Sequence, residues 1–249
     1  MLYVLLSDLH ANLEALQAVL GDIDERYPQV DQILCLGDIV GYGADPEPVL
    51  SLTRSIMDRC IRGNHDKAVA FGENVEWFNP AARDATYWTL NQLSVDSLDF
   101  LRELPKGPDL VDSFQICHGS PLDEDEYIIT ATDAAIVAQK VDLGVTCFGH
   151  THVQGGFCVL QGQATTLPRP TSDENSKTVE LEETAYYLLN PGSVGQPRDQ
   201  DSRAAYAVLD SDNRLFHMHR VPYEIAAAQT KILAAGLPER LAVRLSYGR

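Results

Sequence analysis

Short apolar runs recur along the chain, and each ends at a polar turn that contains glycine or histidine. A short, mostly apolar run is typical of a strand that is buried on both faces. Ligands of open α/β sheets bind just beyond the carboxyl ends of such strands, so we expect these turns to meet at one edge of the molecule. Five runs have this construction, at residues 3–6, 33–36, 60–61, 114–117 and 145–148.

A segment with helical periodicity lies between the first two of these runs. Between residues 12 and 27 the apolar side chains fall on one helical face, and Pro28 ends the pattern. A strand–helix–strand order predicts a parallel pair of strands joined by a right-handed crossover. A second helix is expected to begin at Pro46, with Asp45 as its cap, and to reach about residue 58.

Residues 67–105 contain no strand signal, and we expect them to form a helical insertion or cap. One helix is expected at about 80–93, and a second, shorter helix is expected to end at about residue 104. Four aromatic residues are concentrated in this stretch. Either they pack in the core, or they form a lid over the edge of the sheets that stacks on a nucleobase. They are Trp77, Phe78, Tyr87 and Trp88.

The second half of the chain changes to a hairpin pattern after a helix at 133–140. The apolar runs 157–160 and 185–189 flank a polar segment, 165–183, which predicts a flexible excursion. A turn at 210–213 joins the runs 204–209 and 215–221. An alanine-rich helix at 223–235 and a short helix after Pro238 predict a helical tail over residues 223–249.

These elements predict an α/β fold in which a two-sheet β-sandwich is flanked by helices. No convincing linker interrupts the chain, so residues 1–249 are expected to form a single domain. The composition is typical of globular proteins, with 45% hydrophobic and 22% charged residues. No run approaches the roughly 18 apolar residues of a transmembrane helix, so we expect no membrane partner.

Net charge and cysteine content limit the classes of partner and the cellular compartments that fit this chain. The formal net charge of −17 argues against binding to polymeric nucleic acid, but not against a small phosphorylated substrate held through divalent cations. The five cysteines show no C-x-x-C spacing, and an odd number in apolar runs favours a reducing, cytoplasmic location. The first strand leads directly to Asp8, so we expect no cleaved signal peptide.

Residues with oxygen and nitrogen ligand atoms follow all five apolar runs. The motifs, in order, are D-x-H, G-D, G-N-H-D, H-G and G-H-T-H. Carboxylate, amide and imidazole groups suit manganese, iron, zinc and similar ions, and the absence of thiolates disfavours a structural zinc site. These groups are too many for one tetrahedral ion and fit two ions that share a carboxylate, an arrangement suited to in-line displacement at phosphorus. The motifs contribute Asp8, His10, Asp38, Asn64, His65, His118, His150 and His152.

The ordered set of motifs resembles the calcineurin-like metallophosphoesterase superfamily, and within it the small bacterial and archaeal phosphodiesterase-like group. The resemblance covers essentially the whole chain, including NPGSVGQPR at 190–198 and GLP at 236–238. It implies a hydrolase with a dinuclear metal centre, a phosphodiesterase or phosphatase that cleaves a small phosphodiester or nucleotide by two-metal hydroxide attack. The implied cofactors are two divalent ions, manganese first, with Fe, Zn, Ni, Co or Mg as alternatives.

The resemblance also implies a role for each motif residue. The first ion would be bound by Asp8, His10 and His152, and the second by Asn64, His118 and His150. Asp38 would bridge the two ions. His65 would be catalytic: it would face the substrate phosphate and stabilise or protonate the leaving oxygen.

One departure from the family concerns the turn after Asp38. The protein serine/threonine phosphatases continue the G-D motif with Val-Asp-Arg-Gly, whereas this chain continues with Ile-Val-Gly-Tyr-Gly. This disfavours a protein phosphatase and leaves Asp66 or Asp45 as candidates for orienting the catalytic histidine. Arg62 and Arg198 are candidate substrate contacts, although Arg62 can equally pair with a core carboxylate.

Two other functions stay open. Some superfamily members have lost metal ligands and act as non-catalytic interaction modules, which metal content together with hydrolysis of a bis-aryl phosphate would distinguish. A nuclease is disfavoured by the acidic charge, and salt-dependent DNA binding would revive it. The two histidines outside the motifs, His217 and His219, are predicted to be ordinary surface residues.

Overall fold

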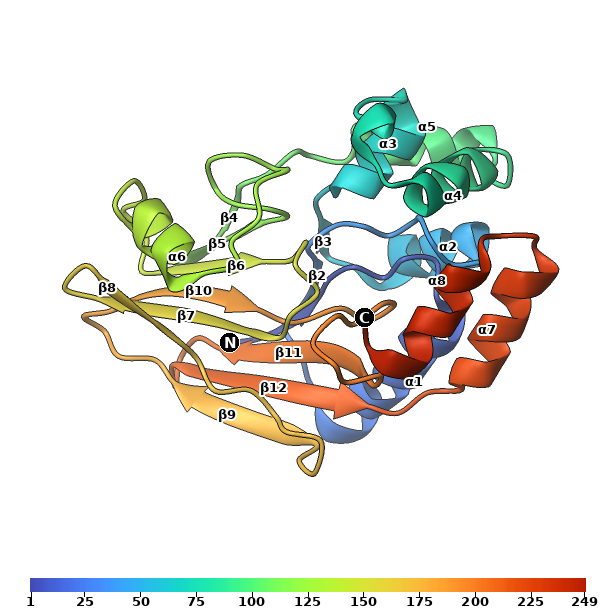
Figure 1. Cartoon of the computed structure of the whole chain (residues 1–249). Helices are drawn as coiled ribbons and strands as arrows, with labels where there is room; N and C mark the ends of the chain where they lie inside the picture. Colours follow the sequence, from blue (N-terminus) through green and yellow to red (C-terminus); the bar gives the residue numbers. More distant parts are fainter.

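Two six-stranded sheets form the centre of the structure, a computed structural model that describes all 249 residues (Figure 1). The first sheet has the order β3-β2-β1-β11-β12-β9, and the second has the order β4-β5-β6-β10-β7-β8. Both sheets are mixed, with β1, β2 and β3 parallel in the first and β5, β6 and β10 parallel in the second. The predicted sandwich and the parallel β1–β2 pair are therefore confirmed.

The strands of the first sheet are β1 (Leu2–Leu6), β2 (Gln32–Cys35), β3 (Arg59–Cys60), β9 (Ser176–Glu180), β11 (Ala204–Asp210) and β12 (Leu215–Val221). Those of the second sheet are β4 (Asp109–Val111), β5 (Phe114–Cys117), β6 (Val145–Phe148), β7 (Gly155–Leu160), β8 (Gln163–Thr166) and β10 (Tyr186–Asn190). All five apolar runs that precede a ligand motif thus form strands.

Helices cover the outer faces and one end of the sandwich (Figure 1). They are α1 (Leu13–Arg26), α2 (Pro46–Ile56), α3 (Asn64–Phe71), α4 (Pro80–Leu90), α5 (Val95–Glu103), α6 (Ala131–Ala138), α7 (Ile225–Ala234) and α8 (Glu239–Val243), with 3₁₀ turns η1 (Val75–Trp77) and η2 (Arg244–Tyr247). None of them combines the length and the hydropathy that crossing a membrane requires.

Alternation along β1 shows how the core is divided. Tyr3 and Leu5 point into the apolar layer between the two sheets, where they join residues such as Phe114. Val4 and Leu6 point to the other face and pack in the layer that contains α1 and α2. A strand that is buried on both faces has no exposed side, which explains why it appears in the sequence as a continuous apolar run.

Two expectations about the elements are wrong. The polar segment 165–183 is no flexible excursion, because it contains β9, which pairs with β12 at the edge of the first sheet. Residues of β9 alternate between exposed and half-buried positions, so an edge strand resembles a loop in sequence. Asp45 holds the N-cap position of α2, which begins at Pro46 as predicted, but the expected side-chain cap does not form, because the Asp45 side chain accepts a hydrogen bond from Lys231 at 2.9 Å instead.

Candidate metal centre

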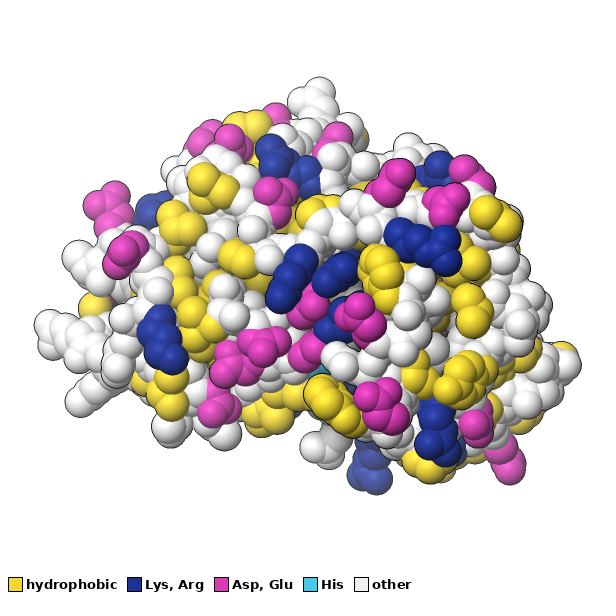
Figure 2. Space-filling view, turned by 90° about the horizontal axis from the view of Figure 1, so that it is seen from above, with side chains coloured by type: hydrophobic (Ala, Val, Ile, Leu, Met, Phe, Trp, Pro, Cys, Tyr) yellow, Lys and Arg dark blue, Asp and Glu magenta, His cyan; other side chains and the backbone are white.

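The residues of the five motifs meet at one edge of the sandwich, where β1, β2 and β3 of the first sheet end beside β5 and β6 of the second. The aspartates and histidines of the motifs are no more than 4% exposed, and Asn64 is half-buried. Hardly any histidine surface is visible in the space-filling view (Figure 2). The sequence-predicted site residues are therefore brought together below the surface.

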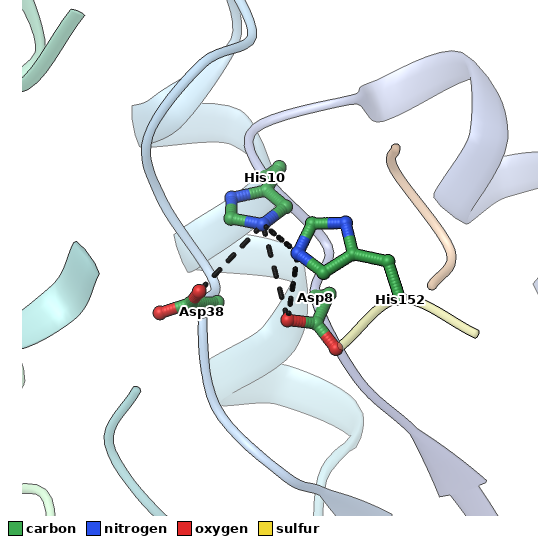
Figure 3. Close-up of side chains that lie close together, drawn as sticks. All are labelled: Asp8, His10, Asp38 and His152. Atoms are coloured by element: carbon green, nitrogen blue, oxygen red, sulfur yellow. Dashed lines mark hydrogen bonds and ion pairs between the residues drawn. The ribbon is translucent and has the colours of Figure 1, made fainter. Parts of the chain in front are cut away.

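Four of these side chains form a first cluster and point toward one another (Figure 3). Asp8, His10, Asp38 and His152 each place a candidate ligand atom within 4.8 Å of the others. The Nε2 atoms of His10 and His152 are 3.1 Å apart, and Asp8 Oδ1 lies 3.2 Å from His152 Nε2. Such a spacing suits several ligands that face one central cation.

A second cluster shares Asp38 with the first and adds His118 and His150, again within 4.8 Å. Asn64 belongs here too, because its Oδ1 lies 3.2 Å from His118 Nε2. One oxygen of Asp38, Oδ2, lies 3.6 Å from His10 Nε2 and 3.4 Å from His118 Nε2. The same carboxylate oxygen therefore faces both clusters.

Main-chain carbonyls fix the orientation of three histidine rings. The distance is 3.2 Å from His10 Nδ1 to Val40 O, 2.8 Å from His118 Nδ1 to Leu36 O, and 2.5 Å from His152 Nδ1 to Gln196 O. A carbonyl can only accept, so each Nδ1 carries the proton and each Nε2 presents its lone pair to the cluster in the neutral ring. Metal-binding histidines are typically held in this way.

Three buried ligand atoms have no hydrogen-bond partner, namely Asp8 Oδ1, Asp38 Oδ2 and His150 Nε2. Leaving such atoms unpaired costs roughly 1–3 kcal/mol each, and more for a charged group. Cations between the clusters would satisfy all three. The donor set, the burial and these unpaired atoms therefore fit divalent metal ions.

The backbone is strained at five of the motif residues. Asp8, His10, Asp38, His150 and His152 all adopt positive φ between 48° and 63°. This left-handed conformation costs roughly 1–3 kcal/mol for a residue other than glycine, and it persists where the surrounding structure enforces it. Strain concentrated at these positions is typical of a functional site.

Electrostatics in the metal-free protein are dominated by burial and by the two aspartates. Burial opposes ionisation of Asp8 and Asp38, but the charges of His152 and His118 respectively bring both pKa values below their ordinary range. Burial likewise opposes protonation of His118, yet the charge of Asp38, whose Oδ2 lies 3.4 Å from His118 Nε2, raises its pKa to about 10. Burial lowers the pKa of His150 to about 3 and also lowers the pKa values of His10 and His152.

Neither Asp66 nor Asp45 contacts the ring of His65, so both expectations about its orientation are wrong. The Asp66 carboxylate instead accepts hydrogen bonds from the main-chain N–H groups of Asp38 at 2.8 Å, Gly63 at 2.9 Å and Val40 at 3.1 Å. Burial and the charge of Asp38 raise its pKa to about 7. Asp66 thus holds the turn after β2 against the start of α3.

His65 lies in the first turn of α3, not at a strand end, and its orientation comes from packing. Its ring lies 4.4 Å from the ring of Tyr42 and 4.6 Å from that of Phe78, measured between centroids. A Cβ on Gly41 would lie 2.7 Å from His65 Nδ1, so the ring needs a glycine there. Burial lowers its pKa to about 4, and Nδ1 has no hydrogen-bond partner.

The two candidate arginines have different environments. Arg62 forms a two-point ion pair with Glu124 at 3.1 Å for both contacts, so it pairs with a carboxylate as the alternative interpretation had it. Arg198 lines a pocket of about 190 Å³ together with Asn64 and His65. Of the two, only Arg198 faces the site.

The aromatic residues of the cap divide between the two expected roles. Phe78 packs on His65, and the 77%-exposed Trp77 lines the same pocket, as a lid would. Trp88 packs against the cluster formed by α4, α7 and α8, and Tyr87 is exposed and lines none of the pockets described here. The lid interpretation therefore fits Trp77 and Phe78 only.

Sequence reasoning missed Tyr127, whose ring stacks on that of His150 at a centroid distance of 3.8 Å. It lies in an acidic loop, and no local pattern marks it. The surface assignment of His219 is wrong, because this residue is 5% exposed, stacks on Tyr206 and lies 2.8 Å from the hydroxyl of Tyr27. His217 is partly exposed and bonds to Thr178.

Known proteins match the chain over its full length. The family model of the calcineurin-like phosphoesterase superfamily domain matches residues 1–214. The uncharacterized protein MJ0912 of Methanocaldococcus jannaschii is 35% identical over 258 residues, which cover 98% of this chain and 97% of that protein. A metallophosphoesterase from Sphaerobacter thermophilus is 37% identical, with a TM-score of 0.85 over 100% of this chain and 99% of that one.

A third match concerns the fold alone. The hypothetical protein PH1004 of Pyrococcus horikoshii OT3 superposes with a TM-score of 0.80 at 19% identity, over 100% of this chain and 98% of its own.

Proposed function

Because the chain belongs to the calcineurin-like phosphoesterase superfamily, we propose that it is a dinuclear metal-dependent phosphodiesterase or phosphatase that hydrolyses a small phosphorylated substrate. The observation that carries this proposal is Asp38 Oδ2, a buried and unpaired carboxylate oxygen between two histidine clusters. A single carboxylate that faces both clusters could contact two closely spaced ions, the arrangement that assists in-line displacement at phosphorus.

In this proposal Asp8, His10 and His152 would hold the first ion, Asn64, His118 and His150 would hold the second, and Asp38 would contribute to both sites. Manganese is the expected metal, with Fe, Zn, Ni, Co or Mg as alternatives that the same O and N ligands accept. Bound ions supply activation of the attacking water and neutralise charge on the phosphoryl oxygens.

The chain's own residues supply positioning and proton transfer. His65 lies beside Asn64 at the start of α3, so a phosphate on the ions would lie against its ring and at the positive end of the helix. We propose that His65 donates a hydrogen bond or a proton to the leaving oxygen and that Arg198 contacts the substrate. The cap at 67–105 and the tail at 223–249 would then complete one metallophosphoesterase domain.

Substrate size follows from the space around the site. The pocket beside His65 holds about 190 Å³, and a second pocket beyond Tyr127 holds about 450 Å³. Such volumes suit a small organic phosphate or a nucleotide. With a net charge of −17, polymeric nucleic acid is not an expected substrate.

The test is a metal-by-substrate screen of the purified chain. Aryl phosphate monoesters and diesters, cyclic nucleotides and dinucleoside polyphosphates are offered with Mn²⁺, Co²⁺, Ni²⁺, Zn²⁺ and Mg²⁺, and bound metal is counted in parallel. We expect two ions per chain and metal-dependent hydrolysis. A chain that binds no metal and cleaves none of these esters would be an interaction module instead.

Replacing Asn64 by alanine should remove mainly the second ion and spare the first. Asn64 offers one neutral oxygen, 3.2 Å from His118 Nε2, whereas the first cluster contains the carboxylates of both Asp8 and Asp38, so the second site is expected to be the weaker one. Chelator titration followed by metal analysis measures the effect. Loss of both ions in parallel would contradict the assignment.

Affinity for the second ion should rise with pH between about 7 and 9, whereas affinity for the first should not. The pKa of His118 is raised to about 10, so His118 carries a proton over this range in the metal-free protein, and a metal ion must displace that proton. The pKa values of His10 and His152 are lowered, and these rings are already neutral.

Calorimetry in buffers of different ionisation enthalpy counts the protons released. One proton per second-site ion at pH 8 is expected, which makes the affinity rise roughly tenfold per pH unit. An affinity of the second site that stays constant from pH 7 to 9 would contradict the raised pKa of His118.

A further inference from the structure

Two arginines beside the site have no aspartate or glutamate side chain as a partner, although the chain carries 36 acidic residues and a net charge of −17. None of the ion pairs in the structure includes Arg198 or Arg244, whereas Arg62, Arg203 and Arg220 are all paired. Arg198 Nη2 donates to Gln196 Oε1 at 3.1 Å and to the Tyr42 hydroxyl at 3.3 Å. Arg244 Nε donates to an oxygen of Arg249, the last residue of the sequence.

Both guanidinium groups lie over the same aromatic ring. Their central carbons are 5.6 Å and 5.9 Å from the centroid of Tyr42, in Arg198 and Arg244 respectively. That ring also lies 4.4 Å from the ring of His65, so Tyr42 places the two positive charges next to the proposed acid. Both arginines line the pocket of about 190 Å³ together with His65 and Asn64.

This arrangement leaves the guanidinium group of Arg198 incompletely satisfied. Arg198 Nε is buried and has no hydrogen-bond partner. Arg244 is half-buried, and burial together with the charge of Arg198 lowers its pKa to about 10. Two like charges held close in a partly desolvated pocket repel each other, and an anion between them would relieve this repulsion. Guanidinium groups suit phosphate because they donate two parallel hydrogen bonds.

Arg244 comes from a part of the chain that the shared family model does not cover. That model matches residues 1–214, whereas Arg244 begins η2 in the C-terminal tail. The tail packs against α4 and the turn that carries Tyr42. A specificity element supplied by the tail would therefore be added to the common metal site.

We propose that Arg198 and Arg244 bind a second, non-scissile phosphate that the leaving group carries, so that the substrate is an organic bisphosphate. This proposal rests on the hydrolytic function proposed above. A water oxygen bonds to the scissile phosphorus, the phosphorus–oxygen bond to the leaving group breaks, and the leaving oxygen takes a proton. The products are inorganic phosphate and an alcohol that keeps the second phosphate.

The experiment compares 1,3-propanediol bisphosphate with propyl phosphate, which share the same kind of alkoxide leaving group and differ in the second phosphate. Activity toward 4-nitrophenyl phosphate and metal content report on the hydrolytic site separately. The unmodified chain should show a kcat/KM roughly 100-fold or more higher for the bisphosphate. Arg198→Gln and Arg244→Gln should each reduce that ratio roughly 10- to 100-fold, because each removes a charge-assisted contact.

Arg83→Gln is the matched control, since Arg83 is exposed on α4, lines neither pocket, and its loss removes the same unit of charge. It should leave the ratio unchanged. Equal kcat/KM for both propyl substrates in the unmodified chain would overturn the second phosphate site while the hydrolytic function stands. An equal loss on both substrates in Arg198→Gln and Arg244→Gln would place these arginines on the scissile phosphate and also overturn it. Hydrolysis of bis-4-nitrophenyl phosphate without hydrolysis of 4-nitrophenyl phosphate would overturn the bisphosphate substrate and leave the hydrolytic function standing. Absence of hydrolysis of both esters would remove the proposed function, and this inference with it.

Discussion

Asp38→Asn should abolish hydrolysis and strip metal from the protein, the largest loss expected of any single substitution in this chain. Its Oδ2 is the one oxygen that faces both clusters, 3.6 Å from His10 Nε2 and 3.4 Å from His118 Nε2. A neutral amide cannot offset the mutual repulsion of two divalent ions. Even outer partners of metal ligands contribute roughly 10- to 100-fold in metal affinity, so loss of the shared charge should exceed that range.

The substitution should not unfold the chain. Asp38 Oδ1 accepts the main-chain N–H of His65 at 2.8 Å, a bond that an amide oxygen can also accept, but the substitution removes the negative charge that lies 3.4 Å from His118 and raises its pKa to about 10 in the metal-free protein. Thermal unfolding after chelation near pH 7 should therefore remain cooperative, with a midpoint below that of the unmodified protein because the Asp38–His118 attraction is lost. Asp24→Asn, at an exposed position of α1, is the control for loss of one charge. Two full metal equivalents and unchanged turnover in Asp38→Asn would reject the shared role.

The site at the edge of the sheets could be predicted from the sequence because both signals that mark it, the apolar run and the polar residues after it, are local. A strand such as β2 is buried on both faces and appears as a continuous apolar run, and the polar residues that follow it stand at its carboxyl end. The site can be predicted without knowing the order of the strands within each sheet. Any arrangement that keeps the parallel strands together brings Asp8 and Asp38 to the same edge.

Residues that reach the site through tertiary packing carry no such signal. Tyr127 lies in an irregular acidic loop, and its loop is held by Glu124, which binds both Arg62 and Lys67. Arg244 lies in the last turn of the tail and meets Arg198 only because both contact Tyr42. Nothing within a few residues of either position indicates its neighbours, so only the folded chain reveals them.

The start of α3 shows a third limit of sequence reasoning. Gly63 precedes this helix and makes no side-chain cap, and Asp66 at its third position instead binds the N–H of Gly63. A Cβ at Gly63 would lie 2.1 Å from Asp38 Oδ1, so the close approach of the two turns requires glycine there. The G-N-H-D motif therefore combines a helix start with a contact to the neighbouring turn, and its aspartate serves the backbone rather than His65.

His65→Ala should keep both ions and lose rate by an amount that depends on the leaving group. The ring lies outside both clusters of candidate ligand atoms, and its Nδ1 has no partner that the substitution would leave unpaired. Burial lowers the pKa of His65 to about 4, so the ring is neutral near pH 7 and offers an N–H to the leaving oxygen. A phosphate dianion bound beside it would favour the protonated ring and its transfer of a proton.

Proton donation of this kind contributes roughly 10²–10⁴-fold. Alkyl esters, whose alkoxide leaves poorly, should show the full loss in His65→Ala, and 4-nitrophenyl esters the least, because nitrophenolate departs without a proton. His217→Ala removes a partly exposed histidine from β12 and should change neither rate. An equal loss for every leaving group would instead assign His65 to stabilising charge on the phosphoryl oxygens. Loss of a metal ion from His65→Ala would refute both catalytic roles and make His65 a metal ligand.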